Sequence, residues 1–222
     1  MLFAGVEPVS LVDYPGEIST VLFTQGCNLQ CEYCQNQELI PLGLPKEGVS
    51  DYQALSIIRR NYPKIKHIVI TGGEPGVHKK ALAGFLYDLK REFPNINVKI
   101  DSNGMIPNFI QDLSVSANFI ALDYKGPAFP YYKDNFSIWQ NSLKWLVLFP
   151  QSEVRLTVYP KYFPNETKNW EAIARLLENR TVVIQQYRQT EKTPRVFPYM
   201  EDILRSAGAI IGRSAKTVSY RI

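Results

Sequence analysis

Every cysteine of this 222-residue chain lies in one stretch, Gln25-Gly26-Cys27-Asn28-Leu29-Gln30-Cys31-Glu32-Tyr33-Cys34. Three and then two residues separate the thiols, so a single short loop can bring all of them to one centre. Closed structural zinc sites use four protein ligands, whereas a metal centre that activates a small molecule keeps one position free. Thiolates are also the usual ligands of iron–sulfur clusters, and three of them on a four-iron cluster leave one iron open.

Short β-rich runs alternate with amphipathic stretches after this loop. The run at 67–71 is continuously apolar, as expected for a strand that is buried on both faces, and Ser50 is placed to cap a helix. Such alternation predicts a parallel sheet with right-handed crossovers and a site at the carboxyl ends of the strands. The predicted strands are 18–24, 67–71, 96–101, 118–123, 154–159 and 181–187, and the predicted helices are 51–61, 77–93, 106–113, 137–149 and 166–179.

Six strand-then-helix units cannot close the usual eight-stranded barrel, so we expect an open, partial (β/α)6 barrel of the TIM type. The open side would admit a loop of another macromolecule. The pattern weakens after Tyr187, where a helix over 198–206 and a strand or tail over 217–222 are expected. With no convincing linker, we expect one domain over 1–222, with a core at about 17–188 and a C-terminal extension over 189–222.

Three motifs follow the second, third and fourth predicted strands. They are Thr71-Gly72-Gly73-Glu74-Pro75, Asp101-Ser102-Asn103-Gly104 and Asp123-Tyr124-Lys125. Glycine has no Cβ, so the first motif lets the backbone approach a ligand closely, and its carbonyls and the Glu74 carboxylate suit an ammonium group. By itself the second motif is typical of a turn.

Together these motifs resemble the radical S-adenosylmethionine (SAM) superfamily, in which an aromatic residue such as Tyr33 precedes the last cysteine of a Cys-x3-Cys-x2-Cys loop. With Ser10-Leu11-Val12-Asp13-Tyr14-Pro15-Gly16 before the first predicted strand, the chain is similar to the activating enzymes of glycyl radical proteins. Among these it most resembles those that act on anaerobic ribonucleoside-triphosphate reductase. The resemblance runs from about Ser10 to Tyr187 and implies the partial-barrel fold.

The resemblance implies a [4Fe-4S] cluster on Cys27, Cys31 and Cys34, with SAM bound to the open iron. One electron, expected from a flavodoxin or ferredoxin, would cleave SAM to methionine and a 5′-deoxyadenosyl radical. This radical would remove hydrogen from a glycine of the partner, here anaerobic ribonucleotide reductase. A cofactor of this kind supplies the chemistry, while the protein supplies placement and excludes water.

The resemblance also implies roles for residues around SAM. Gly72, Gly73 and Glu74 would bind its amino group, and Ser102 keeps the hydroxyl of the family's Asp-Thr-Asn-Gly motif. Asp101 and Asp123 would hold a monovalent cation, for which oxygen ligands are suited. The cationic groups of Lys125 and Arg155 would neutralise the SAM carboxylate. The residues expected to bind cofactor are therefore Tyr33, Gly72, Gly73, Glu74, Asp101, Ser102, Asp123, Lys125 and Arg155.

Several alternatives stay open. His67 or His78 could complete a zinc site with the cysteines, in a non-enzymatic interaction module. Either aspartate could form an ion pair with Lys125, and Arg155 could form a structural salt bridge. Finally, the substrate could be a small molecule, as in an enzyme like 7-carboxy-7-deazaguanine synthase.

Composition limits partners and location. Hydrophobic residues make up 45% of the chain and charged residues 21%, with a net charge of +4. No run of Lys and Arg exceeds two residues, so nothing argues for a nucleic-acid partner. No apolar stretch approaches the roughly 20 residues that span a bilayer. Three clustered thiols do not make a disulfide framework, which favours the reducing cytoplasm.

Overall fold

The computed structural model describes residues 1–193 and 200–221. Its centre is an eight-stranded sheet in the order β10-β9-β8-β7-β6-β5-β3-β2, in which all strands from β3 to β10 run parallel and β2 pairs with β3 in the antiparallel direction. A short two-stranded ladder of β1 (Leu2–Phe3) and β4 (Val49–Ser50) forms a second sheet, which contacts β3 through β1. The sheet strands are β2 (Gly5–Tyr14), β3 (Glu17–Thr24), β5 (His67–Gly72), β6 (Asn97–Ser102), β7 (Phe119–Tyr124), β8 (Gln151–Val158), β9 (Thr181–Gln186) and β10 (Thr217–Arg221).

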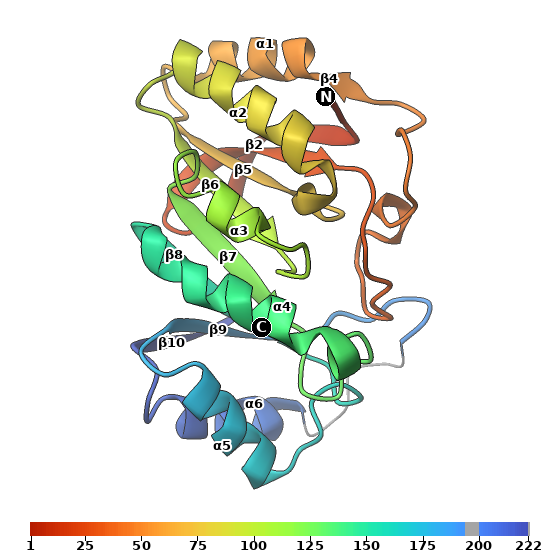
Figure 1. The fold of residues 1–222 in the computed structure, drawn as a ribbon, viewed down its shortest axis with the longest axis vertical. Helices are drawn as coiled ribbons and strands as arrows, with labels where there is room; N and C mark the ends of the chain where they lie inside the picture. The colour runs from red at the N-terminus through yellow and green to blue at the C-terminus, as the bar shows by residue number, and fades with distance from the viewer. Residues whose placement is uncertain (194–199, 222) are drawn as a thin grey trace.

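A helix follows each of the six parallel strands from β3 to β9, which confirms the predicted alternation (Figure 1). In Figure 1, α1 and α2 lie at one end of the molecule, near β2, and α5 and α6 lie at the other end, near β9 and β10. The two edge strands, β2 and β10, therefore belong to opposite ends of an open sheet. The helices are α1 (Asp51–Asn61), α2 (Lys79–Glu92), α3 (Phe109–Asp112), α4 (Tyr132–Trp145), α5 (Thr167–Leu176) and α6 (Met200–Ile211), with 3-10 turns η1 (Gln37–Leu39), η2 (Pro75–His78) and η3 (Leu146–Leu148).

The two faces of the sheet are packed differently. Because side chains alternate along a strand, Ile70 and Ile100 join the main core with helix residues such as Leu82 and Trp139. Their neighbours point to the opposite, inner face. There Tyr14, Val21, Val69 and Phe119 form a small separate apolar cluster. The polar side chains of the candidate site lie on this inner face, nearer the carboxyl ends of the strands.

The N-terminal segment is a strand, which the sequence analysis missed. The segment 10–16, expected to precede the first strand, lies largely in β2 and ends in a turn at Pro15 and Gly16. Two register shifts interrupt the pairing of β2 with β3, and Leu11 and Val12 face solvent. The irregular pairing and the exposed apolar residues hide the period-two pattern by which strands are recognised.

Some helix starts also differ from the prediction, and the helix placed at 106–113 is the short α3, which begins at Phe109. The helix placed at 137–149 begins earlier, at Tyr132, because the buried rings of Tyr132 and Trp139 pack with Tyr124 across the first turns of α4. The helix placed at 77–93 begins as the 3-10 turn η2 at Pro75, and α2 proper starts at Lys79. At α4, tertiary contacts override local propensity.

The C-terminal segment extends the same sheet. β10 pairs in parallel with β9, and α6 packs on α5 and β9. The strand predicted over 217–222 is therefore present up to Arg221, while residue 222 and the predicted helix start at 198–199 lie outside the described residues. We infer that 1–222 folds as one domain, since this segment adds to the existing sheet rather than forming another. In the part of the chain that is described, no helix has the length and apolar character to cross a membrane.

The start of α1 gives a test of the fold. Ser50 and Gln53 form a reciprocal capping box: the Ser50 hydroxyl accepts from Gln53 N at 3.2 Å, and the Gln53 side chain accepts from Ser50 N at 2.9 Å. Replacing Ser50 by Ala should cost about 1 kcal/mol and lower the midpoint of thermal unfolding by about 2–4 °C.

The matched control is Ser56→Ala, in the interior of the same helix. Alanine is the better helix former there, so this change should leave the midpoint unchanged or raise it. Equal losses in the two variants, measured by circular dichroism, would contradict the capping role.

Candidate active site

The cysteine loop is fixed where it leaves β3. Gly26 N donates to Leu39 O at 2.8 Å, and Cys27 N donates to Ile40 O at 3.0 Å. The Gln25 side chain donates to two further carbonyls of the following loop, those of Glu38 and Pro41. The cysteines thus sit between the end of β3 and a returning segment that carries η1.

Gly72 and Gly73 are required by close packing of the backbone against this loop. Gly72 has φ of 111°, in the left-handed region, and a Cβ on Gly73 would collide with the carbonyl of Gly26. Gly73 N donates to Thr24 O at 2.9 Å, and Glu74 N donates to Gly26 O at 2.8 Å. The sequence analysis attributed these glycines to the approach of a ligand. In the structure, their first constraint is the cysteine loop itself.

Glu74 points into the protein. Its side chain is buried, and its carboxylate accepts from Gly76 N at 3.0 Å, Ser102 Oγ at 2.8 Å and Asn103 N at 2.7 Å. Burial raises the pKa of Glu74 to about 7, although these three donors lower it in part. In the structure this carboxylate holds the 102–103 backbone, and its predicted role towards an ammonium group stays a prediction.

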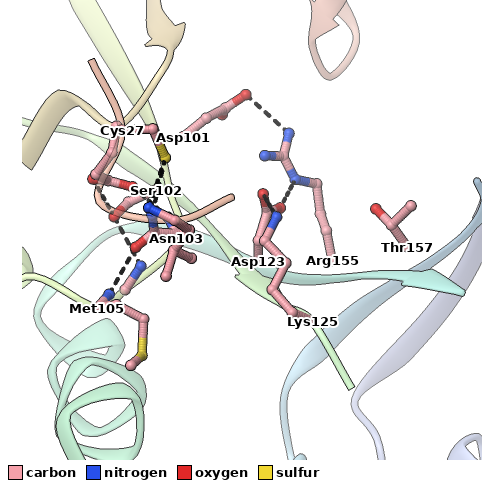
Figure 2. A network of polar contacts seen from close by, with 12 residues as sticks. Cys27, Asp101, Ser102, Asn103, Met105, Asp123, Lys125, Arg155 and Thr157 are labelled. Carbon is pink, nitrogen blue, oxygen red and sulfur yellow. Dashed lines mark hydrogen bonds and ion pairs between the residues drawn. The ribbon is translucent and has the colours of Figure 1, made fainter. Parts of the chain in front are cut away.

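Asn103 links this motif to the cysteine loop (Figure 2). Its amide nitrogen lies 3.8 Å from Cys27 Sγ and donates to Asn28 Oδ1 at 2.9 Å, while its oxygen accepts from Met105 N at 2.9 Å. Leu29 N also donates to Cys27 Sγ, at 3.4 Å. Sequence reasoning gave no separate role to Asn28 or Asn103, although both lie in motifs that it singled out.

A charged cluster faces the cysteine loop from the neighbouring strands β6, β7 and β8. Figure 2 shows the Arg155 guanidinium between Asp101 and Asp123. Its Nη1 lies 2.9 Å from Asp101 Oδ2, and its Nε lies 2.8 Å from Asp123 Oδ1. Lys125 Nζ donates to Asp123 Oδ2 at 2.9 Å, and Lys99 Nζ donates to Asp101 Oδ1. Lys99 was missed, although a lysine two residues before Asp101 in a buried strand must share the same face.

The charged cluster of Lys99, Asp101, Asp123, Lys125 and Arg155 keeps its two carboxylates ionised. Burial alone would raise the pKa of Asp123, but Arg155 and Lys125 lower it to about 2. Burial has the same effect on Asp101, and there Arg155 and Lys99 bring the pKa below its ordinary value. The ion pairs that were left open as alternatives for Asp123, Lys125 and Arg155 are therefore present.

Aromatic rings form a third wall of the site, beside the cysteine loop and the charged cluster of β6, β7 and β8. Tyr33 is buried between Tyr159 and Tyr162, with ring centroids 5.6 and 5.8 Å away, and the Lys125 ammonium lies 5.9 Å from its ring centroid. The adjacent Glu32 pairs with Lys161 at 2.5 Å beyond the end of β8. The cysteine loop therefore spans the mouth of the barrel from β3 to β8.

These walls enclose one cavity of about 480 Å³. Such a volume is ordinary for a pocket that holds a small ligand or cofactor. All twelve residues predicted for the site line it: Cys27, Cys31, Tyr33, Cys34, Gly72, Gly73, Glu74, Asp101, Ser102, Asp123, Lys125 and Arg155. The structure therefore brings the predicted residues together. Their individual roles remain proposals.

The three cysteine thiols are suited to bind an iron–sulfur cluster. All three are free and half-buried, and they line the same cavity. Burial raises the pKa of Cys31 to about 11 and also raises that of Cys27, so the thiolates need positive charge nearby, which iron would supply. N–H groups of Leu29 and Asn103 directed at Cys27 Sγ suit a ligating thiolate.

Neither histidine lies where it could bind a metal together with the three cysteines. His67 begins β5, at the amino end of the sheet, beside Glu17 and Asn97. The His78 ring nitrogen contacts the Gln25 carbonyl at 2.5 Å. Within residues 1–193 and 200–221, neither histidine lines the cavity, so the zinc site that was considered with a histidine ligand has no support.

Comparison with known proteins assigns this site to a family. The model of the Radical SAM superfamily matches residues 21–177, which include the cysteine loop and all three strand-end motifs. A protein of Methanocaldococcus jannaschii that carries the provisional name glycyl-radical enzyme activating enzyme is 30% identical over 99% of this chain and 95% of its own length.

Two further similarities are more distant. The pyruvate formate-lyase-activating enzyme of Clostridium pasteurianum is 29% identical over 54% of this chain and 51% of its own length. Among solved structures, the one described as "Native anSMEcpe with bound AdoMet" matches with a TM-score of 0.58 and 16% identity, over 89% of this chain and 62% of that one. At that identity the match shows the fold alone, and it confirms the partial-barrel prediction.

Replacing Gly73 by Ala tests the packing of the backbone against the cysteine loop. The added methyl group would force the Gly26 carbonyl away, at a cost of about 1–3 kcal/mol. Displacing Gly26 displaces Cys27, so the iron bound after anaerobic reconstitution should fall as well. The control is Gly84→Ala in α2, where an added Cβ meets no atom within 4 Å and should stabilise the helix by up to about 1 kcal/mol. Full iron binding by Gly73→Ala would contradict this role.

Glu74 should make stability depend on pH. Its pKa of about 7 lies above its ordinary value, so the folded state holds the proton more tightly, and this stabilisation is lost as pH rises from about 4.5 through 7. The free energy of unfolding of the cluster-free protein should therefore fall by up to about 3 kcal/mol more in the wild type than in Glu74→Gln over that range. The exposed Glu47→Gln is the control and should keep the wild-type slope. Parallel urea-denaturation profiles for wild type and Glu74→Gln would show that Glu74 does not titrate there.

Proposed function

The chain belongs to the radical SAM superfamily and to its glycyl-radical enzyme activating enzymes, and we propose that its partner is an anaerobic ribonucleoside-triphosphate reductase. Members of the superfamily use an iron–sulfur cluster and SAM. When bound here, these groups would supply a 5′-deoxyadenosyl radical by one-electron cleavage of SAM, and that radical would take hydrogen from a glycine of the reductase. The protein is an enzyme of this kind, and the choice of reductase is the proposal.

The observation that carries this function is the shared cavity, with three thiols on one wall and a cationic cluster on another. Cys27, Cys31 and Cys34 would hold the iron–sulfur cluster. Arg155 uses Nε and Nη1 for the two aspartates, and among the described contacts its Nη2 is not engaged, so it can bind the SAM carboxylate beside the Lys125 ammonium.

The amino group of SAM needs acceptors rather than cations. Because the Glu74 carboxylate is enclosed, we propose that it acts by positioning. Backbone carbonyls of the Gly72-Gly73 segment, which lines the cavity, would accept from the ammonium group. Tyr33 would support Lys125 through the face of its ring. The Ser102 hydroxyl donates to Glu74 and would hold that carboxylate in place.

The exposed edge strand β2 favours a protein, rather than a small molecule, as the substrate. Val9, Leu11 and Val12 are exposed on it, at 53%, 74% and 77%, and the next residue, Asp13, lines the cavity. An exposed apolar edge beside an active-site opening is a common feature of docking surfaces. The reductase is favoured by the resemblance of the segment 10–16, whereas the similarity to pyruvate formate-lyase-activating enzymes makes pyruvate formate-lyase the second candidate partner.

The electron donor and the compartment follow from the same chemistry. We propose a flavodoxin or ferredoxin as donor, and the cytoplasm as location, because thiols that carry a cluster must stay reduced. A small-molecule substrate, as in a 7-carboxy-7-deazaguanine synthase-like enzyme, remains the competing proposal and would require turnover without any partner protein. The monovalent cation expected near Asp101 and Asp123 is not supported, since both carboxylates already have cationic partners.

The test is an electron paramagnetic resonance spectrum of the reconstituted, reduced protein frozen with SAM and anaerobic ribonucleotide reductase. We expect a glycyl doublet, together with 5′-deoxyadenosine in the same tube. The Cys31→Ala variant should give neither product, because only two cluster ligands remain.

The outcomes separate the partner from the chemistry. A doublet on pyruvate formate-lyase but not on the reductase would transfer the assignment to the second partner. Formation of 5′-deoxyadenosine with no doublet on either protein would reject both partners. No 5′-deoxyadenosine from protein with a full cluster would contradict SAM cleavage itself.

A further inference from the structure

Lys99 occupies an unusual place for a lysine. Its side chain is fully buried on the inner face of β6, two residues before Asp101. Buried lysines are rare unless their charge is paired. Here the ammonium group pairs with Asp101 Oδ1 and lies 5.7 Å from the ring centroid of Phe119. Phe119 belongs to the apolar cluster with Tyr14, Val21 and Val69, so Lys99 lies between that apolar floor and the charged cluster.

Each oxygen of the two aspartates has a cationic donor from the protein. Lys99 and Arg155 take the two oxygens of Asp101, and Arg155 and Lys125 take the two oxygens of Asp123. A metal cation needs several oxygen ligands with lone pairs directed at it. A metal ion on the remaining lone pairs of these oxygens would lie beside a buried cationic side chain, and displacing that side chain would leave its charge without a partner.

The charge balance leads to the same conclusion. Three cationic side chains, Lys99, Lys125 and Arg155, stand against two carboxylates, which gives a net charge of 3 − 2 = +1. A further cation would raise it to +2 in a largely buried place, where repulsion is weakly screened. An anion such as the carboxylate of SAM would instead bring the net charge of these five side chains and the anion to zero.

We propose that the Lys99 ammonium group, paired with Asp101, takes the place of the monovalent cation expected near Asp101 and Asp123, so that SAM binding by this protein requires no alkali-metal ion. A tethered ammonium group needs no ion from solution and stays at Asp101 throughout turnover. Lys99 acts through Asp101 and Arg155 and is a positioning residue. This inference depends on SAM binding by the superfamily member and not on which glycyl radical protein is the partner.

The experiment measures SAM binding by the cluster-loaded protein in anaerobic titration calorimetry. Buffers at equal ionic strength contain potassium, sodium or tetramethylammonium, which is too large to be coordinated by two carboxylates. The dissociation constant of the wild type should stay within about twofold across the three buffers. A rise of tenfold or more in tetramethylammonium would overturn the proposal.

The Lys99→Met variant keeps an unbranched side chain, shorter by one heavy atom, and removes its charge. Asp101 then has Arg155 alone, so SAM should bind at least tenfold more weakly in tetramethylammonium, and potassium or sodium should restore part of the affinity. A variant as indifferent to the ion as the wild type would also overturn the proposal. The Lys90→Met control removes a lysine that bonds Asn118 and the Ile96 carbonyl on the other side of the sheet, and it should remain ion-independent.

A second readout guards against loss of folding. The midpoint of thermal unfolding of cluster-loaded Lys99→Met should rise when potassium replaces tetramethylammonium, whereas that of the wild type should not change. If Lys99→Met does not fold, Lys99→Arg retains a cation and should bind SAM independently of the ion. Ion-dependent binding by Lys99→Arg together with ion-dependent wild type would reject the role of Lys99.

Discussion

The enclosed carboxylate of Glu74 is the constraint on which the site depends. One group accepts hydrogen bonds from the turn that opens η2 and from the end of β6, and through Asn103 it reaches Cys27 and Asn28 of the cysteine loop. A buried carboxylate is costly unless donors surround it, so these segments can move only together. The position of the cysteine loop is therefore linked to Glu74 through the 102–103 backbone.

The inner face of the sheet supplies the second constraint, which is electrostatic. An apolar floor beneath Lys99 and Asp101 lowers the local dielectric and strengthens each ion pair above it. The cluster can tolerate this burial because Arg155 joins the carboxylates of two neighbouring strands in a fixed geometry. A site organised in this way has its charges in place before a ligand arrives and needs little rearrangement to bind an anionic group.

Sequence alone could predict the alternating architecture and the residues that line the cavity, because both follow from local patterns. The apolar run of β5 and the cysteine spacing needed no tertiary information. Sequence alone could not predict which hydrogen-bond or ion-pair partner each polar side chain has. Glu74 and the two aspartates carry oxygen atoms that suit a ligand, and only the packed structure shows that protein donors reach them first. The early start of α4 was missed for a similar reason, since its first turn is fixed by aromatic packing against β7.

The motifs of this chain are coupled because they contact one another before they contact any cofactor. Gly73 fits only if Gly26 stays where Cys27 needs it, Glu74 requires the 102–103 backbone, and Asp101 shares Arg155 with Asp123. Residues that share partners in this way do not contribute independently, so their effects on stability are not additive. Cysteine spacing, glycine pair and strand-end aspartates therefore form one structural unit, and finding all of them in one sequence is stronger support for the site than each motif gives alone.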